Sequence, residues 1–272
     1  MDAMSNSHQI SMATIYPYLR SVRKMGLQIN YVKIGRKYGL TEDYLKDRSK
    51  RIPVELVQEQ AREAVERLGD DLIGLKAAQL FNVTQMEGFK DLMFAGHNVK
   101  EALEILDRYM PIFSEMGNME LIADKYNYRL LFKQNIAETI NQQLIDGRMM
   151  FLYKYARCLG GQGFTALHLE HTCPKNCEAY YKKAYQIPVY FNQAHTYFEL
   201  NADWLNHEIT HFQEPCYKKL RHAEKALNQR KNNTSLEEQV RFIIRRMLKT
   251  GKVTNIQVAA ALGLNVRTFQ RR

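Results

Sequence analysis

The C-terminal segment 235–272 carries the sequence signals that restrict the fold most strongly. It contains two capping boxes, in which a hydroxyl side chain precedes a helix and a Glu or Gln follows three residues later: Ser235 with Glu238, and Thr254 with Gln257. Gly263 then stands at a helix end, where the left-handed conformation favours glycine, and Asn265 can cap a further helix. The pattern predicts three helices, the last two joined by a tight turn.

This segment also concentrates the positive charge. The whole chain has a formal net charge of +10. Segment 235–272 contributes +6 of it, because it holds eight basic side chains (Arg241, Arg245, Arg246, Lys249, Lys252, Arg267, Arg271 and Arg272) and two acidic ones (Glu237 and Glu238). Such a concentration is typical of proteins that bind nucleic acid, although a solvated basic surface gives the same count.

Residues 256–272, which read IQVAAALGLNVRTFQRR, resemble the first helix-turn-helix of AraC/XylS-type bacterial regulators. Ala259 stands where the two helices cross, and Gly263 matches the turn position. The family's buried positions are matched by Val258, Leu262, Leu264 and Phe269. The resemblance implies that the second helix enters the major groove of double-stranded DNA. It assigns DNA contacts to Asn265, Arg267, Thr268, Gln270, Arg271 and Arg272.

The sequence departs from this family at its end. The family's DNA-binding unit contains two helix-turn-helix motifs, whereas this chain stops at Arg272, inside the first recognition helix. The resemblance therefore implies a truncated DNA-binding domain. Because short helices are marginal in water without tertiary packing, we expect this chain to bind DNA weakly and without sequence preference.

The chain ahead of this segment predicts an α+β domain. Apolar residues at helical spacing run from Ile10 to Gly117 and predict successive helices. A hairpin is expected over Met119–Lys125 and Tyr128–Phe132, and a helix over Ile136–Leu159. The remaining elements alternate: strands over Phe164–Glu170, Val189–Phe191 and Thr196–Leu200, and a helix over Lys175–Ala184.

These patterns divide the chain into two domains. Residues 229–234 are polar, charged and without apolar periodicity, so we predict a linker there. Residues 1–228 then form a mostly helical domain with a small sheet, and residues 235–272 an all-α helix-turn-helix segment.

The first domain is similar, in weak motifs that occur in the right order, to the arabinose-binding-like sensing domain of one AraC subgroup. The motifs are Arg51-Ile52-Pro53, residues 98–103 (NVKEAL), residues 167–171 (LHLEH), residues 185–191 (YQIPVYF) and Phe198. The resemblance implies that this domain binds a small effector, whose identity the sequence does not give. It does not imply that the effector is arabinose, and it leaves the direction of regulation open.

Candidate effector residues come from an aromatic concentration between Tyr180 and Trp204 and from basic residues near the start of the domain. The candidates are Lys33, Arg36, Tyr185, Tyr190 and Phe198. Core packing explains the aromatic residues equally well, and a solvated helix face explains the basic ones. His168 and His171, on or beside an apolar strand, are interpreted as packed or hydrogen-bonded residues.

The main rival function is a zinc-dependent hydrolase, because His207-Glu208-Ile209-Thr210-His211 matches the H-E-x-x-H pattern. Pro215 argues against it, since its ring clashes with the carbonyl of residue 211 in a continuous helix. Nucleophile and phosphate-loop patterns are missing, and Cys173 and Cys177 have no second pair to complete a metal site. We therefore expect no enzyme activity, cofactor or metal.

Location and partners follow from the same reading. A secretory signal and an apolar run long enough to cross a membrane are both missing, so a cytoplasmic protein is expected. The expected partners are double-stranded DNA and a small-molecule effector, with a homodimer left open. The alternative is a ligand-binding or oligomerisation domain without specific DNA binding of its own.

Overall fold

The structure is a computed structural model that describes residues 8–27, 31–83, 91–92, 94–124, 127–136, 139–160, 162–209, 240, 254–261 and 264–271. The chain divides into two compact units, Met1–Leu220 and Arg221–Arg272. The predicted linker at residues 229–234 lies outside the described residues and stays a prediction. Among the described residues, no helix combines the length and apolar character needed to cross a membrane.

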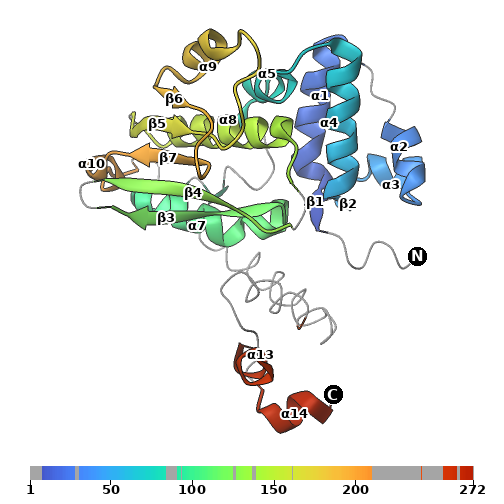
Figure 1. Ribbon diagram of the computed structural model, residues 1–272, viewed down its shortest axis with the longest axis vertical. Helices are drawn as coiled ribbons and strands as arrows, with labels where there is room; N and C mark the ends of the chain where they lie inside the picture. Colours follow the sequence, from blue (N-terminus) through green and yellow to red (C-terminus); the bar gives the residue numbers. More distant parts are fainter. Residues whose placement is uncertain are drawn as a thin grey trace. The chain divides into compact units, whose positions relative to one another are not determined.

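The N-terminal part of the first unit is helical, as the apolar spacing predicts. Its elements are β1 (Gln9–Ser11), α1 (Met12–Lys24), α2 (Tyr31–Lys37), α3 (Glu42–Lys46), β2 (Arg51–Pro53), α4 (Val54–Leu68), α5 (Ile73–Leu80) and α7 (Val99–Phe113). Figure 1 shows α1 and α4 side by side, with the β1–β2 pair at their base. Sequence analysis did not predict these two strands, because three residues are too short to show an alternating pattern.

Arg51 fastens this strand pair to the end of α7. One guanidinium nitrogen donates to the carbonyl oxygen of Gln9 (3.0 Å), that of Pro111 (3.2 Å) and a carboxylate oxygen of Glu115 (2.9 Å). The other donates to the carbonyl oxygen of Ile112. The carbonyls of Pro111 and Ile112 lie at the C-terminal end of α7, where the helix dipole favours a cation.

The second part of the unit is a five-stranded sheet with helices packed on it, which confirms the α+β prediction. The strand order is β3-β4-β7-β5-β6, with all neighbours antiparallel except β5 and β6. The strands are β3 (Gly117–Ala123), β4 (Tyr128–Gln134), β5 (Phe164–His168), β6 (Val189–Tyr190) and β7 (Tyr197–Leu200). The helices among them are α8 (Gln142–Cys158), α9 (Glu178–Tyr185) and α10 (Ala202–Leu205).

Helices α8 and α10 differ from the sequence prediction. The helix expected over 136–159 begins only at Gln142, because the Asn141 side chain caps it by accepting a hydrogen bond from the Gln143 backbone N–H (2.8 Å). The four-residue helix α10 was not predicted. It is capped in the same way by Asn201, and it is too short for a periodic signal.

Helices α5 and α8 approach closely at Gly74. A Cβ atom at this position would lie 2.0 Å from the Gln143 carbonyl oxygen, a distance that no side chain can tolerate. The Gln143 side chain joins the helices, accepting from the Gly74 N–H (2.8 Å) and donating to the Asp71 carbonyl oxygen (2.8 Å). A Cβ at the facing Gly147 would only reach ordinary contact with Gly74, at 3.5 Å.

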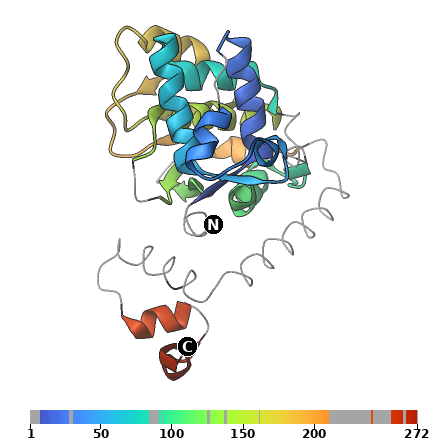
Figure 2. The same cartoon turned by 90° about the vertical axis from the view of Figure 1, so that its right-hand side faces the viewer.

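The second unit contains two short helices, α13 (Asn255–Ala261) and α14 (Val266–Arg271), drawn in red in Figures 1 and 2. The predicted capping box of α13 is present. The Thr254 hydroxyl accepts from the Gln257 N–H (3.3 Å), and the Gln257 side chain accepts from the Thr254 N–H (3.1 Å). Asn265 caps α14 by accepting from the Thr268 N–H at 2.7 Å. The other predicted box, Ser235 with Glu238, lies outside the described residues.

The two glycines at the α5–α8 contact provide a matched stability test. Gly74→Ala forces the helices apart, so we expect the free energy of unfolding to fall by about 2 kcal/mol. Gly147→Ala adds an ordinary contact and a better helix former, so we expect no loss and up to about 1 kcal/mol of gain. Urea unfolding followed by circular dichroism measures both. Equal effects of the two substitutions would contradict the close approach.

Candidate functional site

Two of the predicted effector residues lie in the core. The side chains of Tyr185 on α9 and Phe198 on β7 are completely buried. Their ring centroids are 6.2 Å apart, and both rings contact Tyr153 on α8, at 5.2 Å and 6.4 Å. This aromatic cluster joins α8, α9 and the sheet, and it explains the burial of both residues by packing.

The other three predicted effector residues lie elsewhere. Tyr190 points outward from β6 with 48% of its surface exposed, and its ring lies 4.9 Å from that of His168. Lys33 and Arg36 are exposed on α2, which packs against α3 and α4. The structure therefore does not bring the five residues together, and their assignment to an effector stays a prediction.

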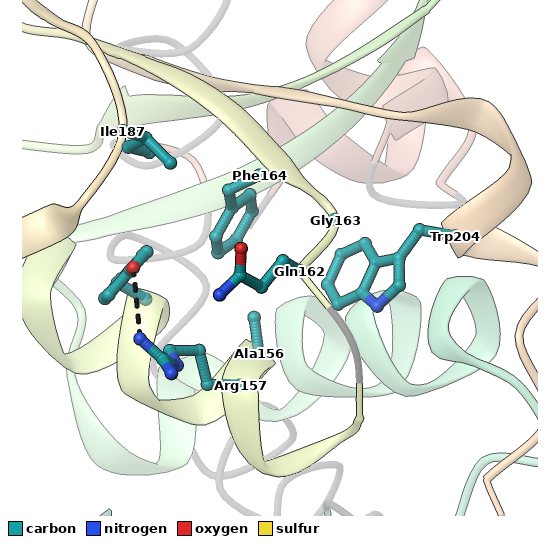
Figure 3. A pocket seen from close by; sticks show the side chains of 8 residues that line it. Ala156, Arg157, Gln162, Gly163, Phe164, Ile187 and Trp204 are labelled. Atoms are coloured by element: carbon teal, nitrogen blue, oxygen red, sulfur yellow. Dashed lines mark hydrogen bonds between the residues drawn. The ribbon is translucent and has the colours of Figure 1, made fainter.

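A small pocket at the C-terminal end of α8 is lined by residues other than the five predicted effector residues. We call it the aromatic pocket (Figure 3). Its lining residues are Tyr153, Ala156, Arg157, Gln162, Gly163, Phe164, Ile187 and Trp204. Its volume is about 10 Å³, room for roughly one water molecule. The ring centroid of Phe164 lies 5.5 Å from that of Trp204 and 6.1 Å from that of Tyr153, so aromatic faces form much of the lining.

The local sequence explains how this pocket forms. Helix α8 ends before Gly160, whose φ of +99° suits glycine and turns the chain back toward β5. The Trp204 indole N–H donates to the Gly160 carbonyl oxygen at 2.6 Å. Gly163 lies directly against the same indole, where a Cβ would come within 1.7 Å of the ring. The glycine break was visible in the sequence, but the aromatic residue that meets it comes from α10, about 40 residues later, and only folding shows this.

Arg157 gives the pocket its charge. This exposed side chain donates to the Tyr153 hydroxyl at 3.5 Å and to the Gln186 side-chain oxygen at 3.3 Å, both long for hydrogen bonds. Within the described part of the chain, no carboxylate forms an ion pair with it. Gln162 is also exposed, and Figure 3 shows its amide lying between Phe164 and Arg157.

A second polar feature, which we call the Asp146 network, lies inside the domain. The Asp146 carboxylate on α8 is completely buried. One carboxylate oxygen accepts from the Tyr181 hydroxyl at 2.7 Å and from the Gln142 amide at 3.3 Å. The other lies 3.2 Å from Nε2 of His171. The network fastens α9 and the segment after β5 to α8, and it confirms that His171 is a hydrogen-bonded residue.

The surroundings of His171 favour its protonated form. Nε2 faces the Asp146 carboxylate, and Nδ1 lies 3.1 Å from the Thr172 carbonyl oxygen, so both ring nitrogens meet acceptors. Burial lowers the pKa of His171, but the hydrogen bond and charge of Asp146 raise it by more, helped by the Thr172 carbonyl and by Glu170. The net result is a raised pKa and a buried ion pair.

The first three residues of the zinc-binding pattern have an extended backbone. Glu208 forms an antiparallel bridge with Asn98, while the Val99 N–H donates to the His207 carbonyl oxygen (3.1 Å) and the Ile209 N–H to that of His97 (2.9 Å). A zinc peptidase needs this pattern on one helix, so the geometry at residues 207–209 does not fit. His211 lies outside the described residues.

The predicted DNA-binding residues lie on and before α14 in the second unit. Asn265 and Arg267 are exposed, and Thr268 is half-buried. The backbone of Gln270 and Arg271 continues the helix, whereas Arg272 lies outside the described residues. In α13, Val258 and Ala259 are buried, as the helix-turn-helix pattern predicts. These positions leave the assignment of DNA contacts a prediction.

The ion pair of His171 predicts how stability depends on pH. Because the folded-state pKa is raised, its stabilising effect is complete below the usual histidine pKa of about 6.5 and is lost as the pH rises through the raised value. We expect the free energy of unfolding of the wild type to decrease over this interval, and that of His171→Gln to decrease less. His195→Gln, which removes a largely exposed imidazole, is the control. Identical pH profiles for the wild type and His171→Gln would rule out this role.

A family model identifies the family of this chain. A family model described as the arabinose-binding domain of AraC transcription regulators, N-terminal, matches residues 33–209. The crystal structure of the transcriptional regulator CdpR from Pseudomonas aeruginosa is similar, with a TM-score of 0.56 and 15% sequence identity over 96% of this chain and 78% of that chain. At this identity the likeness shows the fold alone. No curated protein matches the chain. Because the family match spans more than half of the sequence, the chain belongs to the AraC-type transcription regulators with an arabinose-binding-like N-terminal domain.

Proposed function

We propose that this protein regulates transcription in response to a small molecule, binding the molecule in its first unit and DNA through α13 and α14. The observation that carries the proposal is the capped helix pair of the second unit, in a chain that belongs to the AraC-type regulators. A protein that binds bacterial DNA acts in the cytoplasm. In this proposal the first unit binds the effector, the second unit binds DNA, and neither unit acts as an enzyme.

The helix pair has the features that a DNA reader needs. Val258 and Ala259 bury one face of α13, with exposed fractions of 2% and 0%. A small residue at a helix crossing lets the two helix backbones pack closely. This close packing holds the second helix in the orientation that it needs to enter the major groove. The Asn265 cap fixes the residue at which α14 begins. The backbone position of the exposed Arg267, two residues later, is therefore also fixed.

Charge supplies the attraction that such a reader uses. Lys and Arg side chains that neutralise phosphates release condensed counterions, which makes affinity fall with salt concentration. Segment 235–272 accounts for +6 of the net charge of +10, so the second unit contributes most of it. Among the basic side chains of this unit that the structure describes, that of Arg267 is exposed.

The sensing role belongs to the first unit. This unit holds the aromatic pocket, in which aromatic faces meet a cationic side chain at the surface. Sites of mainly apolar lining with a few polar groups are typical of small-molecule binding. The extended backbone at Glu208 favours this reading over the zinc hydrolase.

A DNA-binding experiment tests the proposal. The full chain is titrated against a labelled duplex pool of random sequence at several salt concentrations, and bound duplexes are sequenced. We expect binding that weakens with salt. Arg267→Gln should lower affinity and reduce the slope of log affinity against log salt by about 1, as expected for one lost phosphate contact.

Arg67→Gln on α4 provides the control, since it removes an exposed arginine that pairs with Glu63 in the first unit. It should leave both affinity and slope unchanged. If Arg267→Gln and Arg67→Gln behave alike, α14 is not the DNA-binding helix. If the wild type binds no duplex at low salt, DNA binding by this chain is refuted.

A further inference from the structure

Among the described residues, the aromatic pocket contains one positive charge, Arg157, and no carboxylate that pairs with it. The neighbouring cation on α8 is already engaged. Lys154, one turn before Arg157 on α8, donates to the carbonyl oxygens of Gln79 (2.7 Å), Ala78 (3.2 Å) and Phe81 at the end of α5. Arg157 instead makes two long contacts with neutral groups. The pocket therefore offers a single planar guanidinium to a ligand.

A single guanidinium above aromatic rings selects a particular chemistry. Its parallel N–H groups match a carboxylate in a bidentate pair. A phosphate dianion favours a second cation, and Arg157 is the one cation among the described residues that line the pocket. The faces of Phe164 and Trp204 favour a flat apolar body next to the anionic group.

The pocket is closed by a side chain that can move. Its volume of about 10 Å³ is too small for an aromatic ring. In Figure 3 the Gln162 side chain lies next to the Phe164 ring, with its amide on the side of Arg157. Gln162 is exposed, and among the described residues no hydrogen bond holds its side chain, so its rotation opens space beside Phe164 and Arg157 without moving the backbone.

We propose that the aromatic pocket is the effector site and that its ligand is a small aromatic carboxylic acid. The carboxylate pairs with Arg157, and the ring packs against Phe164 and Trp204 after Gln162 swings outward. This inference rests on the proposed function, because it names the class of effector that the first unit senses.

The position of Trp204 couples ligand binding to the segment that follows it in the chain. Its helix α10 is followed at once by residues 207–209, which pair with residues 97–99 at the start of α7. Residues 210–253 then lead along the sequence to α13. A ligand that packs against the Trp204 indole therefore contacts the end of the first unit that precedes the second unit in the chain.

The test uses Trp204 itself, because it is the single tryptophan of the chain. The full chain, without DNA, is titrated with benzoate and, separately, with benzamide, a neutral molecule of nearly the same shape. We expect saturable change in tryptophan fluorescence with benzoate and a much weaker response to benzamide. Arg157→Gln should weaken benzoate binding by about tenfold or more, the usual effect of losing a charge-assisted hydrogen bond.

The matched control is Arg67→Gln, which changes an equally exposed arginine on α4 and should bind benzoate like the wild type. Calorimetric titration gives a second readout that does not depend on fluorescence. Equal binding of benzamide and benzoate, equal binding by Arg157→Gln and the wild type, or no saturable benzoate binding at millimolar concentration would each overturn the proposal. Because these measurements contain no DNA, their failure leaves the DNA-binding result unaffected, and the two proposals can fail separately.

Discussion

The first unit is organised around the contact between α5 and α8, where the absence of a side chain at Gly74 lets the two helices touch. The Gln143 side chain then bonds to the backbone of α5 in both directions, at Gly74 and at Asp71. A close helix contact with satisfied polar groups is rigid, since protein interiors are packed like crystals. Helix α8 is consequently held at its first turns, and its remaining length can serve as a support for other elements.

Nearly every face of α8 is used for this support. Asp146 anchors α9 through Tyr181, and Lys154 holds the last carbonyl oxygens of α5. Arg148 reaches the sheet, donating to the Gly117 carbonyl oxygen at 2.7 Å with its guanidinium carbon 5.0 Å from the centre of the Phe132 ring. Burial lowers the pKa of Arg148 to about 10, against the opposing charge of Asp107, so this buried group remains a cation at neutral pH.

These buried charges bear on the proposed effector site. Unpaired buried charges are costly, so each of them fixes the geometry of the element that satisfies it. The stabilising contacts occupy the first and middle turns of α8, whereas the aromatic pocket lies at its last turn, beside Gly160 and the short helix α10. A ligand in this pocket contacts the rigid helix α8 on one side and the short helix α10, which is held by local contacts, on the other. This difference in rigidity suits a site at which ligand binding affects another part of the chain.

The sequence by itself determined the local elements of this protein and its class. Helical spacing identified the N-terminal helices, the strand-like patterns of residues 119–125 and 128–132 identified the β3–β4 hairpin, and Thr254 with Gln257 identified the start of α13. These signals depend on neighbours within a few residues. Very short elements such as β1, β2 and α10 gave no periodic signal. Tertiary structure alone decided that Tyr185 and Phe198 pack in the core while Tyr190 faces outward. It also decided that Arg157 and Trp204, distant in sequence, line one pocket, since this depends on how α8, β5 and α10 meet in space and no spacing along the chain records it.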